Sequence, residues 1–166
     1  MNGYTHIVHS FDPVFDENSR VLILGSLPSV KSREEGFYYG HPRNRFWAVT
    51  AALANRPLPV TTEEKKSMLL GAGIAVWDVV AECDIIGSSD ASIKNVKPAD
   101  LSRVLNSCSI RAIFANGGTA ARLYNKFQRQ LTGREIITLP STSPANAAWS
   151  VERLTDEWRD SIGGLL

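Results

Sequence analysis

Four short apolar segments divide the chain, and their pattern predicts four β-strands. Each is bounded by Gly, Asn or Pro, which end strands and open turns. In the first segment the apolar residues are consecutive, which is typical of a strand buried on both faces, as in a parallel sheet. The predicted strands run from Arg20 to Leu24, from Ile74 to Trp77, from Ala112 to Ala115 and from Glu135 to Leu139.

Between these segments, apolar residues recur with the spacing of a helix. Phe46, Val49 and Leu53 lie on one helical face, and Pro57 ends that segment because proline breaks helices. The same spacing predicts two helices in the second half of the chain, one through Ala120, Leu123, Phe127 and Leu131, and one through Val151, Leu154, Trp158 and Ile162.

A capping-box pattern marks one more helix. Thr61 is followed three residues later by Glu64, and Gly71 can close the helix that they open. Strands that alternate with helices imply right-handed crossovers and a parallel sheet covered on both sides. We therefore expect one α/β domain over residues 1–166, with three layers, α/β/α, around a parallel sheet of about four strands.

Composition and charge narrow the possible functions. The 166 residues suit one hydrophobic core, and the net charge of +1 means that any DNA binding needs a local basic patch. Cys83 and Cys108 have no metal-ligand spacing, so we expect free thiols, no metal and no other cofactor. No signal-peptide pattern or bilayer-spanning apolar run is present, which favours a cytoplasmic protein without a membrane partner.

A long loop of unusual composition follows the first predicted strand. Residues Gly25 to Trp47 read GSLPSVKSREEGFYYGHPRNRFW, which mixes aromatic rings with cations and suits a site that stacks a flat base and holds phosphates. Ligands of parallel sheets bind beyond the carboxyl ends of the strands, where this loop lies. Plainer interpretations stay open: Phe46 and Trp47 fit a helix face in the core, and Arg43 and Arg45 fit a solvated surface.

Two motifs together resemble the uracil-DNA glycosylase superfamily, and most closely its hypoxanthine-DNA (deoxyinosine) glycosylase branch. The related mismatch-specific branch has a Gly-x-x-Pro turn after the first strand, then an aromatic residue, then His-Pro-x-Asn-Arg-Phe-Trp. The matching residues are Gly25 to Ser29, Tyr39, and His41 to Trp47. The second motif, LPSTSPANA, follows the last strand at Leu139 to Ala147.

The chain departs from the better-known branches in its polar residues. The best-known uracil enzymes carry an Asp in the first motif and a His in the second, and neither is present here. The mismatch-specific branch has an Asn that aligns with Leu27, whereas the hypoxanthine branch relies on the Asn that corresponds to Asn44. The resemblance therefore implies a monofunctional, hydrolytic DNA glycosylase for deaminated bases, hypoxanthine first, that flips the nucleotide out of the duplex.

The resemblance also implies roles for residues around the flipped base. Asn44 is the predicted catalytic residue, whose carbonyl orients a water beneath the sugar C1′, and Tyr39 stacks on the base. Local alternatives are a helix N-cap for Asn44 and core packing for Tyr39. We expect Ser26, Leu27 and Ser141 to bind the leaving base.

DNA contacts are predicted around both motifs. A Ser/Pro-rich loop binds phosphates through hydroxyls and amides, and in the family it also fills the gap left by the flipped base. Ala145 aligns roughly with that wedge and is small for the task, and His41 has the alternative of a loop residue bonded to backbone. The predicted DNA-binding residues are Ser29, Lys31, His41, Arg43, Thr142, Ser143, Ala145 and Asn146.

Three other functions stay open at this point. A uracil or mismatch glycosylase would share the fold and the site. A non-catalytic module for damaged DNA is less favoured because Asn44 is retained. A hydrolase or transferase of free nucleosides would not need the LPSTSPANA loop. The expected partner is DNA that contains a deaminated base, and we expect a monomer, associated with the nucleoid if the source is bacterial.

Overall fold

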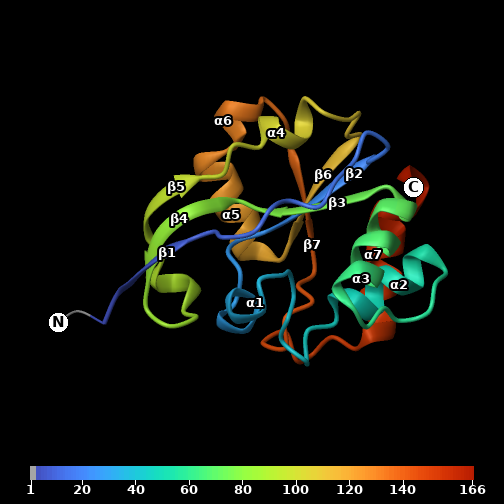
Figure 1. Cartoon of the computed structure of the whole chain (residues 1–166), viewed down its shortest axis with the longest axis horizontal. Coiled ribbons are helices and arrows are strands. Elements are labelled where there is room, and N and C mark those ends of the chain that lie inside the picture. The colour runs from blue at the N-terminus through green and yellow to red at the C-terminus, as the bar shows by residue number, and fades with distance from the viewer. Residues whose placement is uncertain (1–2) are drawn as a thin grey trace.

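The computed structural model describes residues 3–166 and contains the predicted parallel sheet (Figure 1). Its strand order is β3-β2-β6-β7, and every neighbouring pair is parallel. The strands are β2 (Val21–Gly25), β3 (Ile74–Asp78), β6 (Ala112–Asn116) and β7 (Ile136–Leu139). All residues of β2 are buried, as its consecutive apolar residues predicted.

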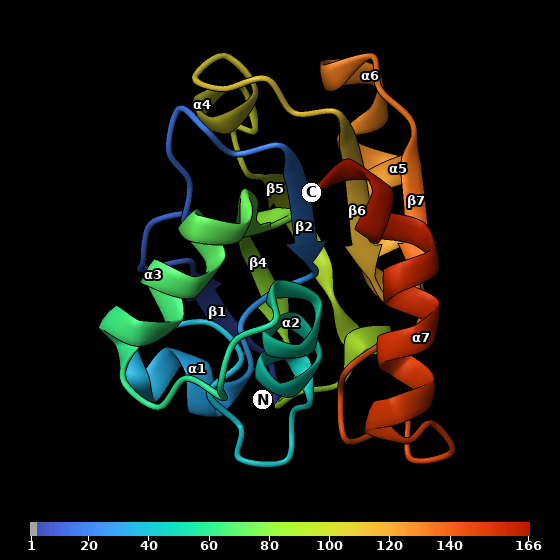
Figure 2. The ribbon, with the colours of Figure 1, turned by 90° about the vertical axis from the view of Figure 1, so that its right-hand side faces the viewer.

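Helices cover both faces of this sheet, which confirms the three-layer α/β/α prediction. On one face lie α2 (Phe46–Ala54), α3 (Thr62–Ala72) and α7 (Val151–Ile162), and on the other lies α5 (Gly118–Phe127) (Figure 2). The predicted apolar face of α7 is in the core, where Trp158 is fully buried and donates from Nε1 to the Pro140 carbonyl at 2.9 Å.

A second, antiparallel sheet was not predicted. It has the order β1-β4-β5 and consists of β1 (Thr5–Val8), β4 (Val80–Ile85) and β5 (Lys94–Pro98). β5 reads KNVKP and is largely exposed. Because it contains no apolar run, the hydrophobic pattern did not indicate a strand there. Only Val79 separates β3 from β4, so the chain passes directly from the large sheet to the small one.

Short helices fill several connections. The predicted long loop contains α1 (Val30–Glu35), whose N-cap Ser29 accepts a hydrogen bond from the Ser32 amide at 3.2 Å. An unbroken loop was therefore the wrong expectation, because Ser29 was read as part of a motif and not as a cap. The remaining short elements are η1 (Asp90–Ser92), α4 (Ser102–Leu105), α6 (Arg129–Thr132) and η2 (Gly163–Leu165).

Two predicted helix ends are corrected. Helix α3 has Thr61 as its N-cap, as expected, but its C-cap is Gly73, whose φ of 79° suits glycine, and not Gly71. Helix α5 ends at Phe127, because the buried Gln128 side chain donates to two backbone carbonyls. Leu131 then falls in α6, where it is 71% exposed and is not part of the predicted face.

Three absences concern the described residues alone. Over residues 3–166, no helix is long and apolar enough to cross a bilayer, and Cys83 and Cys108 are unpaired. In the same range, no three His, Cys, Asp or Glu side chains gather as metal ligands would.

Candidate active site

A cavity of about 930 Å³ lies at the carboxyl ends of the parallel strands. It is lined by the loops that follow β2, β6 and β7, together with residues between β4 and β5. Every predicted site residue lines it except Lys31 and Arg43. Lys31 is exposed and pairs with Glu35 at 3.6 Å, and Arg43 is exposed beside the motif. The two motifs therefore meet around one cavity.

Tyr39 occupies an unusual backbone position at this cavity. Its φ of 50° is left-handed, a conformation that bulky residues rarely adopt and that clusters at functional sites. The ring stacks on Phe46 with centroids 3.9 Å apart, and Phe46 and Trp47 are core residues as predicted. The Trp47 indole donates to the Tyr39 carbonyl at 3.2 Å. Tyr39 thus packs on the core and also faces the cavity.

The Tyr39 hydroxyl is buried and has no hydrogen-bond partner among the described residues. Burial and, second, the Asp78 carboxylate raise its pKa well above the ordinary value. The Asn116 side chain is close enough to oppose this shift, although the two groups are not aligned as a hydrogen bond. Tyr39 is therefore a neutral phenol at physiological pH.

Asn44 lines the cavity with its carboxamide held from two sides. Its Oδ1 accepts from the Phe46 amide at 2.9 Å and from the Thr142 hydroxyl at 2.8 Å. The first bond satisfies an amide at the start of α2, so the Asn44 side chain caps this helix as the alternative interpretation expected. The N-cap residue by position is Arg45, whose side chain makes no capping bond.

These two bonds change the expected chemistry of Asn44. A carbonyl oxygen has two lone pairs, and both are used. The group left for a ligand is the Nδ2 amide, which donates. The expectation that the carbonyl accepts from a water is therefore wrong for this geometry.

Thr142 connects Asn44 to strand β6. Its hydroxyl accepts from Asn116 Nδ2 at 2.9 Å, and its backbone amide donates to Asn116 Oδ1 at 3.0 Å. Thr142 is fully buried. The predicted contact of Thr142 with DNA phosphate is therefore wrong, because its hydroxyl is enclosed in the relay from Asn116 to Asn44.

Arg45 joins the two motifs and was missed as a site residue. Its guanidinium donates to the carbonyls of Ser143 at 2.8 Å and Asn146 at 3.0 Å, and also to those of Thr142 and Trp149. Its backbone amide donates to the Thr142 carbonyl at 3.1 Å. The alternative interpretation of Arg45 as a solvated surface charge is therefore wrong. No sequence signal marks it, because all of these acceptors are backbone atoms about a hundred residues away.

The second motif folds as a sequence of local turns beside the cavity. Ser141 Oγ accepts from the Ser143 amide at 3.1 Å, and Ser143 Oγ accepts from the Ala145 amide at 3.2 Å. Asn146 Nδ2 donates to the Ser141 carbonyl at 3.0 Å, and Ala145 is exposed. The second motif is thus a series of turns, and it also lines the cavity.

His41 lies at the rim. It is exposed, and its Nδ1 accepts from the Arg43 amide at 3.1 Å, as the loop alternative describes. Contacts of His41 with DNA stay a prediction. So do those of Ser29, whose hydroxyl serves α1.

Sequence reasoning also missed a buried pair, Asp78 and His9. Asp78 is the last residue of β3 and lines the cavity, and His9 Nε2 donates to its Oδ2 at 2.8 Å. Both side chains are only 5% exposed. One signal was available, because Asp78 is a charged residue directly after a buried apolar strand. His9 is 69 residues away and lies outside both motifs.

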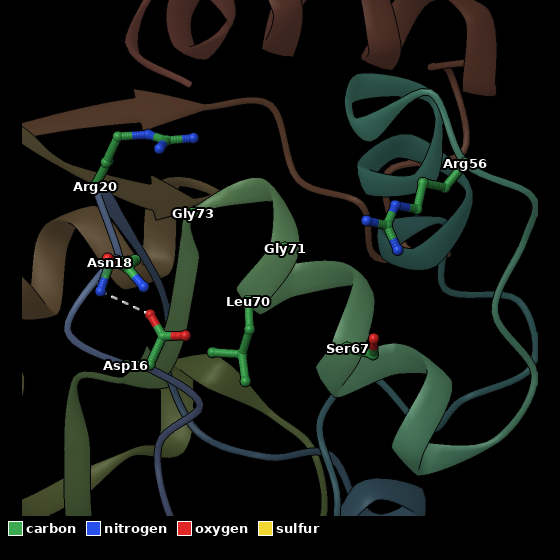
Figure 3. A pocket seen from close by; sticks show the side chains of 8 residues that line it. All are labelled: Asp16, Asn18, Arg20, Arg56, Ser67, Leu70, Gly71 and Gly73. Atoms are coloured by element: carbon green, nitrogen blue, oxygen red, sulfur yellow. Dashed lines mark hydrogen bonds between the residues drawn. The ribbon is translucent and has the colours of Figure 1, made fainter.

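A second cavity of about 640 Å³ lies at the opposite edge of the sheet (Figure 3). Arg20 and Arg56 stand on either side of the C-terminal end of α3, and Arg20 donates to the Ala72 carbonyl at 3.1 Å. No residue of either motif lines this cavity, so the candidate chemistry is confined to the carboxyl edge.

The fold and the site define an α/β/α protein whose candidate site is a cavity that includes Tyr39 and Asn44 and is built from the loops at the carboxyl ends of its strands. The chain belongs to the uracil DNA glycosylase superfamily, whose family model matches residues 13–161. The superfamily resemblance of the two motifs is thereby confirmed.

Individual relatives narrow the comparison. The chain is 36% identical to a hypoxanthine DNA glycosylase of Methanosarcina acetivorans over 154 residues, covering 92% of this chain and 96% of the relative. It is 32% identical over 138 residues to a hypoxanthine DNA glycosylase of Methanosarcina barkeri, covering 82% and 86%. An NMR structure from M. acetivorans, described as a candidate uracil DNA glycosylase, superposes with a TM-score of 0.77 at 33% identity, covering 93% and 96%.

Proposed function

We propose that this chain is a monofunctional DNA glycosylase that hydrolyses the N-glycosidic bond of deaminated bases, with hypoxanthine as its main substrate. Family membership and the two relatives named for hypoxanthine support this function. The observation that carries it is the Asn44 carboxamide, which is held at the cavity by Phe46 and Thr142 and whose Nδ2 makes no hydrogen bond within residues 3–166.

The reaction begins with extrusion of the damaged nucleotide, at a cost of a few kcal/mol that is smallest for a mispaired base. The base enters the cavity and stacks on the face of Tyr39 opposite Phe46. Ser26, Leu27 and Ser141, which line the same cavity, bind the base edge through amides and a hydroxyl.

Cleavage then passes through a sugar cation. The C1′–N9 bond breaks, its electron pair leaves with the base, and the sugar gains oxocarbenium character. Asn44 Nδ2 donates to the water oxygen and holds its second lone pair toward C1′. The electrophile is already cationic, so positioning matters more than a strong base. The new C1′–O bond forms, and the water proton passes to solvent.

DNA contacts at the rim of the cavity and beyond it follow from exposure. Lys31, Arg43 and His41 are exposed around the first motif, and Ala145 is exposed in the second, with Ser143 and Asn146 beside it. We assign the cations to phosphates and the second loop to the space that the base vacates. Neutralised phosphates predict that binding weakens as salt rises.

The test is a cleavage assay on duplex oligonucleotides with a single hypoxanthine, uracil or xanthine, followed by alkali to cut abasic sites. We expect the fastest product from hypoxanthine and no strand cleavage before alkali. A folded protein that binds these duplexes but forms no product would instead be a non-catalytic module. Activity on free inosine but not on DNA would indicate a nucleoside hydrolase.

The assembly and location are part of the proposal. We expect a monomer that acts on DNA in the cytoplasm, near the nucleoid in a bacterium. Size-exclusion chromatography with light scattering, with and without an abasic duplex, tests the monomer, because a stable dimer would show twice the protein mass of one chain.

A further inference from the structure

The free oxygen of Asp78 is the most distinctive feature of the cavity that the mechanism above leaves unused. His9 Nε2 donates to Oδ2 at 2.8 Å, whereas Oδ1 accepts no hydrogen bond from residues 3–166. An ionised carboxylate only accepts, so Nε2 carries the hydrogen. The two side chains are almost fully buried, but Oδ1 itself is open to the cavity that Asp78 lines, where a ligand or water can donate to it.

Gly25 shows where this oxygen points. A Cβ at Gly25 would lie 2.4 Å from Asp78 Oδ1 and 3.3 Å from the Tyr39 hydroxyl. The carboxylate oxygen therefore occupies the place that a Cβ at Gly25 would need, and the Tyr39 hydroxyl lies next to it. The hydroxyl end of the Tyr39 ring is directed to the same place as the carboxylate, so a base stacked on this ring brings one edge to Asp78.

We propose that Asp78, oriented by His9, recognises the ring N–H of the deaminated base. This inference rests on the proposed function and adds how the site distinguishes a deaminated base from the undamaged base. Asp78 contacts the base, and His9 is a positioning residue that fixes the carboxylate and offsets part of its charge as the base departs with its electron pair.

The chemistry of deamination makes an acceptor useful at this place. Adenine carries a lone pair at N1, and deamination to hypoxanthine turns N1 into an N–H donor beside a carbonyl. Cytosine and uracil differ in the same way at N3. A carboxylate oxygen accepts from the N–H and repels the lone pair, so it favours hypoxanthine over adenine and uracil over cytosine. Guanine already has this N–H, so this contact does not distinguish hypoxanthine from guanine.

The unaltered protein gives the first test. Single-turnover rates are measured on duplexes with hypoxanthine and with 1-methylhypoxanthine, whose methyl group replaces the N1 hydrogen. We expect the methylated base to be cleaved about 10- to 100-fold more slowly, since a hydrogen bond to a charged group is lost. Equal rates would overturn the inference. No cleavage of hypoxanthine at all would instead refute the proposed function.

Variants then show that Asp78 is the group that reads N1. Asp78→Ala should slow hypoxanthine cleavage about 10- to 100-fold and bring the ratio of the two rates close to one, whereas Asp78→Asn, which keeps an acceptor oxygen, should keep most of the ratio. Thermal unfolding checks that each variant is folded. A folded Asp78→Ala with the wild-type ratio would contradict the inference.

His9 is tested through the same ratio. His9→Leu should lower it, and His9→Gln, which can still donate to Oδ2, should restore most of it. In Asp78→Ala, adding His9→Leu should have no further effect on the ratio. His6 and Asp84 form a matched control, since they are an exposed histidine–aspartate pair with Nδ1 and Oδ1 2.8 Å apart on β1 and β4. His6→Leu and Asp84→Ala should leave the ratio unchanged.

Discussion

The two edges of the parallel sheet carry cavities of comparable size but very different construction. At the carboxyl edge, Asn44, Thr142 and Asn116 come from three distant segments and are joined by hydrogen bonds. At the amino edge, Arg20 and Arg56 border an open space, and the Arg20 guanidinium donates to the Ala72 carbonyl at the end of the neighbouring helix. The comparison shows that convergence of fixed polar groups, and not volume, marks the site. Parallel strands favour one edge because all of their outgoing loops meet there.

Among changes at the two edges, removal of the Asn44 carboxamide at the carboxyl edge should have the largest effect on kcat. Asn44→Ala loses the group that positions water, so we expect kcat to fall by at least about 100-fold, as for other preorganised polar groups. Gel-shift affinity for a hypoxanthine duplex should stay within a few-fold of wild type. A variant with unchanged turnover would remove Asn44 from the catalytic role.

Loss of the Arg45 contacts should damage both stability and rate. Arg45→Met leaves several carbonyls of the second loop without their charged donor, so we expect about 2–4 kcal/mol less unfolding free energy and a Tm lower by about 5–10 °C. The rate should fall about tenfold because the relay through Thr142 loosens. Scanning calorimetry and single-turnover assays measure the two effects. An unchanged Tm would show that the loop does not depend on this clamp.

Loss of the Thr142 hydroxyl should lower the rate and also cost some stability, because Asn116 Nδ2 loses its buried acceptor. Thr142→Val is close in shape but leaves Asn44 without its second donor, and we expect a rate loss of about tenfold. Thr142→Ser keeps the hydroxyl and serves as the control. Equal rates for the two variants would mean that the relay does not position Asn44.

The amino edge should give the smallest response. Arg56 is exposed and lines only the cavities at that edge among those described, so Arg56→Ala should leave the cleavage rate within about twofold of wild type and Tm within about 2 °C. A tenfold rate loss would show that the amino edge takes part in function and would end the contrast between the two edges.

Patterns of neighbouring residues predicted the parallel strands and the main helices, because these elements depend on local sequence. The apolar runs located all four parallel strands to within one residue, and helical spacing placed α2 and α7. Resemblance located Tyr39 and Asn44 at the cavity. The antiparallel sheet was missed because β5 is short, charged and exposed, and its position depends on pairing with β4.

The remaining site residues were hidden because their partners are distant or lack a side-chain signal. His9 and Asp78 are 69 positions apart and meet only after β3 passes into β4. Arg45 binds backbone carbonyls, which every residue type offers, so neither partner constrains the other in sequence. Thr142 was read as an exposed hydroxyl because the motif gave no indication of its burial.

That last property of Arg45 has an evolutionary consequence. A clamp that holds main-chain oxygens is indifferent to the side chains they carry, so the exposed Ala145 at the loop tip can be exchanged while the loop keeps its anchorage, whereas Ser143 Oγ and Asn146 Nδ2 also hold its turns. Selection can then retune how the enzyme grips different lesions or opposing bases by exchanging residues at the loop tip. The catalytic geometry behind it is inherited unchanged.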